Sequence, residues 1–135
     1  MNSNELKLRT KKFAIRIIKM IDKLPKSNIS DVIGKQLLRS ATSVGANYRA
    51  ACRARSKQEF ISKIKIVEEE SDETLYWLEL IQELKLFRIE QISELIKEAD
   101  ELTAIFTSTA KSAKKNVLEE KSKITNPKSK IDTGA

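Results

Sequence analysis

Residues 56–81 read SKQEFISKIKIVEEESDETLYWLELI, and the spacing of apolar and small side chains in this stretch decides the fold. One stripe of such residues recurs at alternating steps of four and three: Phe60, Ile64, Val67, Ser71, Thr74, Leu78 and Ile81. A mean step of about 3.5 residues is typical of one face of an α-helix in a left-handed bundle. Ser56 and Glu59 form a capping box directly before Phe60. The stretch therefore predicts a long bundle helix that begins at Ser56.

Three further helices are predicted around this segment. The first runs from about Asn4 to Leu24, where Pro25 stops it, and the second from about Asp31 to Arg53. The fourth begins near Glu90, after a weak turn. The core stripes are Leu6, Phe13, Ile17, Met20 and Leu24 in the first helix, Ile33, Leu37, Ala41, Val44, Tyr48 and Ala51 in the second, and Ile92, Ile96, Ala99, Leu102, Phe106 and Ala110 in the fourth. Four such helices with short links predict an all-α, antiparallel, up-down-up-down four-helix bundle.

The length of 135 residues suits one domain. We expect residues 1–114 to form the bundle and residues 115–135 to form a polar, basic tail that frays or is disordered. No apolar run approaches the roughly 20 residues needed to cross a bilayer, and no secretory signal is visible at the N-terminus. The single cysteine, Cys52, cannot form an intrachain disulfide. These features predict a soluble cytoplasmic protein with no membrane partner.

Charge is distributed unevenly along the chain, whose formal net charge is +7. Residues 35–65 carry eight basic side chains and one acidic one, whereas residues 66–110 carry three basic and twelve acidic ones. Such a basic segment offers a docking place for a polyanion such as RNA, or for an acidic protein. The alternative is that these charges are solvated helix faces that pair with one another. Composition leaves both open.

A basic stripe on the second predicted helix is the candidate nucleic-acid site. Its spacing places four cations within about 80° of arc, opposite the core. The members are Lys35, Arg39, Arg49 and Arg53, with Arg55, Lys57, Lys63 and Lys65 extending the stripe into the third helix. Only Tyr48 and Phe60 lie near it in sequence, and both are assigned to the core, so binding is expected to rest on phosphate contacts with little sequence specificity. The alternative is that these arginines pair with carboxylates of the third helix, within one bundle or between subunits.

A second surface is predicted to be an oligomer interface. Large apolar side chains on the third helix point away from its core stripe, and such a surface is typical of subunit contacts. Gly34 and Gly45 lie on one line of the second helix, which indicates that another backbone or a ligand comes close there. The candidate interface residues are Gly45, Ile66, Glu73, Tyr76, Trp77 and Leu80.

Catalytic and metal chemistry have no support in the sequence. The chain has no histidine, so the Glu-x-x-His pairs of a di-iron bundle and a His-activated Cys52 are both excluded. We find no Gly-rich phosphate loop and no dinucleotide fingerprint. Carboxylates of the third helix, such as Glu68, Asp72, Glu79 and Glu83, are interpreted as a solvated or pairing face. We expect no enzyme activity, no cofactor and no metal.

The segment Gln36-Leu-Leu-Arg-Ser-Ala-Thr-Ser-Val-Gly-Ala-Asn-Tyr-Arg-Ala-Ala51, followed by Ser56-Lys-Gln-Glu-Phe60 and Glu73-Thr-Leu-Tyr-Trp-Leu-Glu-Leu80, resembles the four helix bundle protein family. This family is also called the 23S rRNA-intervening sequence proteins, and its relatives include accessory proteins of diversity-generating retroelements. The resemblance covers roughly residues 10–110.

The resemblance implies a bundle that assembles into a ring-like homopentamer, with RNA binding proposed for some members. It places Arg39, Asn47 and Arg49 in the family's signature helix and matches Glu73 and Glu79 to its acidic positions. Many members carry glutamate where this chain has Ala50, so an interaction of that carboxylate is absent or replaced here.

Two functional hypotheses follow from these observations. The first is a homo-oligomeric adaptor whose basic surface binds RNA or another polyanion. The second is a protein-interaction module with no nucleic-acid role, in which the basic stripe pairs with acidic residues of the third helix between subunits.

Overall fold

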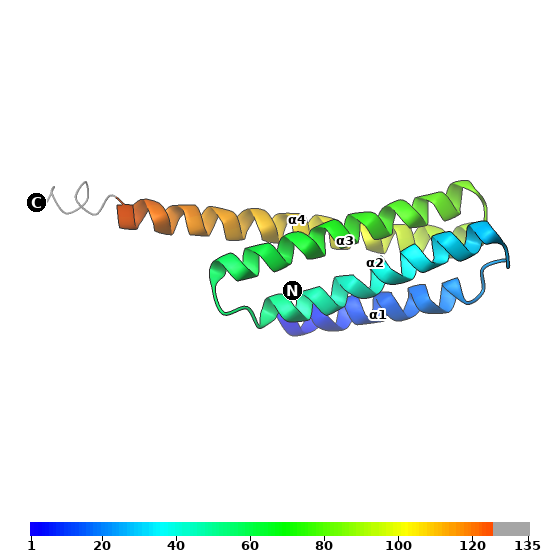
Figure 1. Ribbon diagram of the computed structural model, residues 1–135, viewed down its shortest axis with the longest axis horizontal. Helices are drawn as coiled ribbons and strands as arrows, with labels where there is room; N and C mark the ends of the chain where they lie inside the picture. Colours follow the sequence, from blue (N-terminus) through cyan, green and yellow to red (C-terminus); the bar gives the residue numbers. More distant parts are fainter. Residues whose placement is uncertain (126–135) are drawn as a thin grey trace, which may run out of the picture.

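The computed structural model describes residues 1–125, and within them the protein is all-helical with no β-strand. The four helices are α1 (Ser3–Ile21), α2 (Asn28–Cys52), α3 (Lys57–Glu83) and α4 (Ile89–Thr125). They lie side by side along the long axis of the molecule (Figure 1). The turn between α2 and α3 lies at one end of the bundle, and the other two turns lie at the opposite end. No helix in the described part of the chain is long and apolar enough to span a membrane.

Serine side chains cap the N-termini of the two central helices. The Ser56 hydroxyl accepts a hydrogen bond from the Glu59 backbone N–H at 3.0 Å, as the capping box predicts. The Glu59 carboxylate accepts in return from the backbone N–H of Arg55, one residue before the cap. Helix α2 begins at Asn28, three residues earlier than expected, because the Ser27 hydroxyl caps the Ser30 N–H. The capping serines thus set where α2 and α3 start.

The turn between α3 and α4 is a tight helix C-terminus without glycine. Lys85 has a φ of 55°, in the left-handed region. The Leu86 N–H donates to the Ile81 carbonyl and the Lys85 N–H to the Gln82 carbonyl. This pair of bonds is a Schellman motif, whose left-handed position is most often glycine. A lysine at that position explains why the sequence showed only a weak turn signal.

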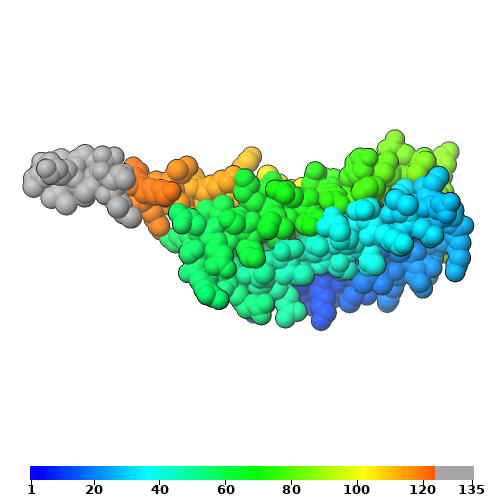
Figure 2. Space-filling model, viewed as in Figure 1, coloured from blue at the N-terminus to red at the C-terminus, as the bar shows by residue number. Residues whose placement is uncertain are grey.

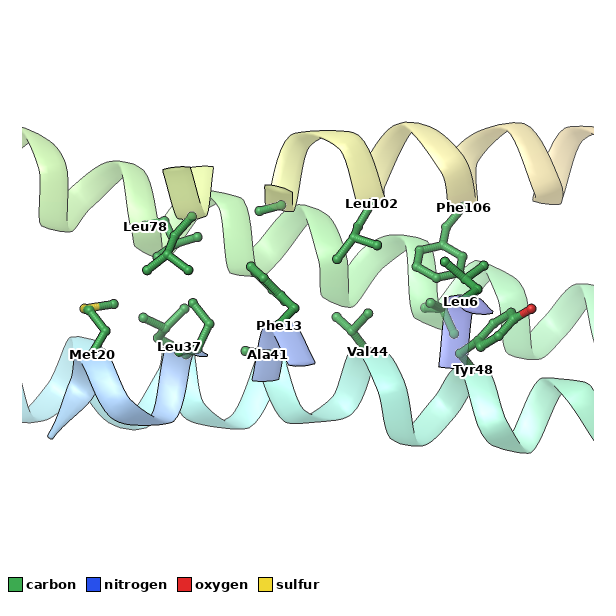
Figure 3. Close-up of a cluster of buried hydrophobic side chains, with 14 of the residues drawn as sticks. Leu6, Phe13, Met20, Leu37, Ala41, Val44, Tyr48, Leu78, Leu102 and Phe106 are labelled. Carbon is green, nitrogen blue, oxygen red and sulfur yellow. The ribbon is translucent and has the colours of Figure 1, made fainter. Parts of the chain in front are cut away.

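The hydrophobic core runs the length of the bundle and matches the predicted stripes. Figure 3 shows side chains of all four helices converging on it, with Phe13, Val44 and Leu102 near the middle of the labelled set. All of the predicted core residues are buried except Leu24, Phe60 and Ile96, which are partly buried and pack against the core. Leu95 is buried in addition. The periodicity argument is therefore confirmed for nearly every core position.

Helix α4 is longer than the sequence indicated. The tail was expected to start at residue 115, whereas α4 continues to Thr125. Its C-terminal turns extend past the α2–α3 turn (Figures 1 and 2). An ion pair between Lys57 and Glu120 ties the extension to the start of α3. Residues 115–125 are polar and lack an apolar stripe, so the sequence predicted disorder there. The segment is nevertheless rich in lysine and glutamate, which are strong helix formers. The rest of the predicted tail, residues 126–135, lies outside the described residues.

Each helix packs mainly on its neighbours in sequence, and the contact between α1 and α4 is smaller than any of these. At that thin seam the Arg9 guanidinium forms ion pairs with Glu98 at 2.6 Å and with Glu101 at 3.1 Å. The two glycines of α2 face α1 of the same chain. A Cβ on Gly45 would lie 3.1 Å from the Thr10 hydroxyl oxygen, and one on Gly34 would lie 3.4 Å from Cγ2 of Ile21. The close approach inferred from the glycines is therefore at least partly the packing of α1.

Candidate functional site

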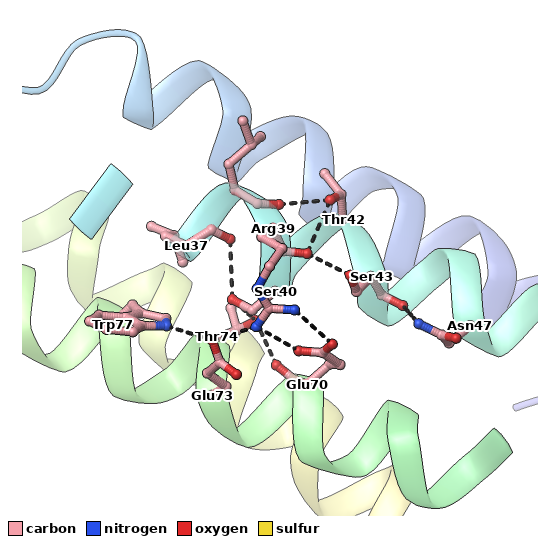
Figure 4. Close-up of polar contacts among 11 residues, drawn as sticks. Leu37, Arg39, Ser40, Thr42, Ser43, Asn47, Glu70, Glu73, Thr74 and Trp77 are labelled. Atoms are coloured by element: carbon pink, nitrogen blue, oxygen red, sulfur yellow. Dashed lines mark hydrogen bonds and ion pairs between the residues drawn. The ribbon is translucent and has the colours of Figure 1, made fainter. Parts of the chain in front are cut away.

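Arg39 forms the centre of a polar network between α2 and α3. Its guanidinium forms ion pairs with the carboxylates of Glu70, at 2.9 Å, and of Glu73 (Figure 4). The Trp77 indole N–H also donates to Glu73, at 3.0 Å. These two carboxylates raise the pKa of Arg39, and the hydrogen bond to Glu70 has the largest effect. Arg39 therefore pairs with carboxylates of α3 within one bundle, which is the alternative to nucleic-acid binding that the sequence left open for the arginines.

A buried hydroxyl pair lies beneath this network. The Thr74 and Ser40 hydroxyls are in hydrogen-bond contact at 3.0 Å, and both residues are buried. The one hydroxyl hydrogen of Thr74 lies within reach of both the Ser40 oxygen and the Glu70 carbonyl, and the Ser40 hydroxyl donates to the Leu37 carbonyl. The hydroxyls of Ser40 and Thr74 both have hydrogen-bond partners. The contact between α2 and α3 therefore contains buried polar groups at this point, but these two are not left unpaired.

The network holds the pKa of Glu73 below its ordinary value of 4.5, chiefly through the Trp77 hydrogen bond and then through Arg39. A lowered pKa means that the folded state binds the proton more weakly than the unfolded state. The stabilisation is therefore complete above the ordinary value and is lost as the pH falls through the folded-state pKa. We expect the stability of the native protein to decrease on acidification more than that of a Glu73→Gln variant. Thermal unfolding between about pH 6 and about pH 3 measures this; parallel pH profiles for both proteins would contradict it.

The remaining predicted cations are mostly free of carboxylate partners. Lys57 pairs with Glu120, as described above. Within residues 1–125 no ion pair involves the others, which are Lys35, Arg49, Arg53, Arg55, Lys63 and Lys65. Lys63 is half-buried and the rest are exposed. The structure thus leaves most of the basic stripe available to an anionic partner.

The predicted interface residues occupy different environments. Ile66 and Tyr76 are exposed to 40% and 53%, although both are large and apolar or aromatic. Trp77 and Leu80 are half-buried and pack against the core, and the Tyr76 ring contacts the Trp77 ring edge-on, with centroids 5.1 Å apart. Glu73 is engaged in the network, and Gly45 lies against Thr10. Ile66 and Tyr76 are thus the most accessible of the set.

Sequence reasoning missed two electrostatic features. Glu98 and Glu101 bind Arg9 across the α1–α4 seam. Lys65 of α3 lies beside Lys114 of α4, and this like-charged neighbour lowers the pKa of Lys114. The sequence could not predict either contact, because each joins two different helices. Residue spacing shows which side chains share a face of one helix, but not which residues of another helix they meet. No group of three or more His, Cys, Asp or Glu side chains in the described chain is arranged to hold a metal ion.

The fold and this site define a helical bundle with a charged seam between two helices and a basic stripe beside it. The model of the 23S rRNA-intervening sequence protein family matches residues 3–108, so the chain belongs to that family. The resemblance drawn from residues 36–51 is thereby confirmed.

A solved structure is similar to this chain over most of its length. It is the crystal structure of a protein of unknown function from the S23 ribosomal protein family of Bacteroides thetaiotaomicron VPI-5482. The two are 36% identical, the match covers 82% of this chain and 99% of that one, and the TM-score is 0.73. Comparison with functionally curated proteins gave no match.

Proposed function

We propose that the protein is a non-catalytic, homo-oligomeric cytoplasmic adaptor, built as an antiparallel up-down-up-down bundle, that binds RNA or another nucleic acid through its basic α2 surface. The observation that carries the proposal is the set of cations without ion-pair partners in the described chain, with Arg49 and Arg53 at its centre. Several unpaired cations along one helix match the repeated charges of a phosphate backbone.

Self-assembly supplies the second part of the proposal. The exposed Ile66 and Tyr76 give α3 an apolar surface beside the Arg39 network. Apolar and aromatic side chains are enriched at the centres of subunit interfaces. A ring, with five subunits as the size that the family resemblance implies, would repeat the basic stripe around one assembly. Repetition raises the affinity for a long polyanion without any new contact.

The test compares two double variants that remove the same charge. Arg49→Gln/Arg53→Gln neutralises the centre of the stripe, whereas Lys11→Gln/Lys12→Gln neutralises two exposed lysines of α1. Binding to a structured RNA is followed by fluorescence anisotropy over a series of salt concentrations. Each lost phosphate contact should make the negative slope of log K against log salt less steep by roughly 0.7–0.9. We expect the arginine variant to lose about two contacts and the lysine variant to keep the slope of the native protein.

Two results would refute RNA binding through the stripe. One is the absence of binding by the native protein at low salt. The other is an arginine variant with the salt slope of the native protein. Either result would favour the second hypothesis, a protein-interaction module with no nucleic-acid role. Arg39 is not part of the expected RNA-binding set, because Glu70 and Glu73 of the same chain already neutralise it. Light scattering at low and high salt separates the two: an oligomer held by arginines dissociates in high salt, and one held by apolar contacts survives.

A further inference from the structure

A pocket of about 490 Å³ opens at the corner where α2 ends, α3 begins and α4 continues past both. Figure 1 shows that corner at the end of the bundle from which α4 extends. The volume lies within the roughly 300–1,000 Å³ range that is typical of small-molecule sites. The pocket exists because α4 does not stop at the end of the bundle, so its added turns form a wall beside the α2–α3 turn.

The chemistry of the lining is divided between an apolar interior and a cationic rim. Ala51 of α2, Phe60 of α3 and Ala113 of α4 supply apolar surface, and Asn116 supplies one amide. Arg55 and Lys57 supply the charge, and none of the lining residues carries a carboxylate. An apolar slot with an amide and positive charge at its edge suits a flat, polar-edged ring attached to a phosphate.

Phe60 indicates that the ring bound in this pocket is a nucleic-acid base. The sequence placed it in the core, but it is only partly buried: it packs against the core and still lines the pocket. Aromatic side chains at the surface of RNA-binding proteins stack on unpaired bases, and amides bond to base edges. The small side chains of Ala51 and Ala113 leave room beside the ring. The corner therefore combines a stacking surface, a group that can bond to a base edge and, in Arg55, a cation that can bind phosphate.

We propose that this pocket holds a single unstacked base of a single-stranded RNA segment, with the neighbouring phosphate on Arg55. The inference rests on the proposed function and deepens it, because it names the single-stranded form of RNA as the partner. The basic stripe leads to the corner through Arg53, which caps the C-terminus of α2. Lys57 is held by Glu120 at the rim, so Arg55 is the rim cation with a free guanidinium in the described chain.

The experiment uses the full-length protein and two labelled strands of equal length and charge, a short oligouridylate and its abasic counterpart. Stacking of one base is expected to make the base-bearing strand bind roughly five-fold or more tightly. Phe60→Leu keeps an apolar contact with the core and should bring the two affinities together while leaving binding of the abasic strand unchanged. Ala113→Leu fills the pocket without removing a core contact and should do the same. The matched control is Phe87→Leu, which changes a partly buried phenylalanine near the opposite end of the bundle and should keep the preference.

The outcomes separate this inference from the proposed function. Equal affinity of the native protein for both strands overturns the base pocket and leaves phosphate-based RNA binding in place. Binding of neither strand at low salt overturns both. A preference that survives in both Phe60→Leu and Ala113→Leu places the base elsewhere and overturns the pocket. Uridine monophosphate that binds as tightly as the oligouridylate overturns the assignment to RNA in favour of a free nucleotide.

Discussion

Replacing Phe106 with alanine is expected to lower the free energy of unfolding by about 3–5 kcal/mol. The Phe106 side chain has no exposed surface and lies in the core, where its ring centroid is 5.4 Å from that of Tyr48 (Figure 3). Truncation removes the transfer free energy of the ring and leaves a cavity between α2 and α4 that rigid helices cannot close. Domains of this kind are stable by only about 5–15 kcal/mol. Urea unfolding followed by circular dichroism measures the loss.

The matched control for Phe106→Ala lies on the same helix. Leu118 is 66% exposed and lies in the C-terminal part of α4. Its replacement by alanine should change the unfolding free energy by no more than about 0.5 kcal/mol. A loss below about 1 kcal/mol for Phe106→Ala would contradict a core that closes around this ring.

Gly45→Val should destabilise the protein by about 1–3 kcal/mol, even though valine is a better helix former than glycine. The added Cβ would lie 3.1 Å from Oγ1 and 3.4 Å from Cβ of Thr10. In a helix, valine holds one preferred rotamer, and its two methyl groups must enter the space between α1 and α2. The Thr10 hydroxyl cannot move aside freely, because it bonds to the carbonyls of Leu6 and Lys7. Thermal and urea unfolding report the change.

The second glycine of α2 supplies the matched control with the opposite sign. A Cβ on Gly34 would meet Cγ2 of Ile21 at 3.4 Å and Cδ1 of Leu24 at 3.9 Å, which are ordinary contacts. Gly34→Ala should therefore stabilise the protein by about 1 kcal/mol. In a Thr10→Ala background, the cost of Gly45→Val should shrink, and a double-mutant cycle gives the coupling. A Gly45→Val protein as stable as the native one would show that α1 does not pack there.

The fold was largely predictable because it rests on patterns with a period. The spacing from Phe60 to Ile81 identifies α3 and its buried face without any knowledge of the other helices, and Ser56 identifies its start. The prediction failed at the end of α4 and was weak at the α3–α4 turn, where the sequence carries little or no local signal. The end of α4 has neither proline nor an apolar stripe to mark it, and a lysine takes the left-handed position at Lys85 that glycine usually occupies.

The candidate site was predictable only as a set of residue types. Spacing placed Arg39, Arg49 and Arg53 on one side of α2, but it does not tell which of them meets a carboxylate on another helix. That depends on how α3 is rotated and shifted against α2, so the Arg39 pairs with Glu70 and Glu73 became visible only in the structure. The same reason explains Phe60. A stripe position assigns it to the core, whereas its partial exposure depends on where α4 runs.

The packing of each helix on its sequence neighbours bears on how the chain folds. Most native contacts join segments that one short turn brings together, so the relative contact order is low and few long loops must close before apolar surface is buried. The hairpins α2–α3 and α3–α4 can form as local units. Closure of α1 against α4 requires the whole chain and forms a smaller contact than any pair of helices adjacent in sequence, so we expect this step to come last in folding and to reverse first in native-state opening.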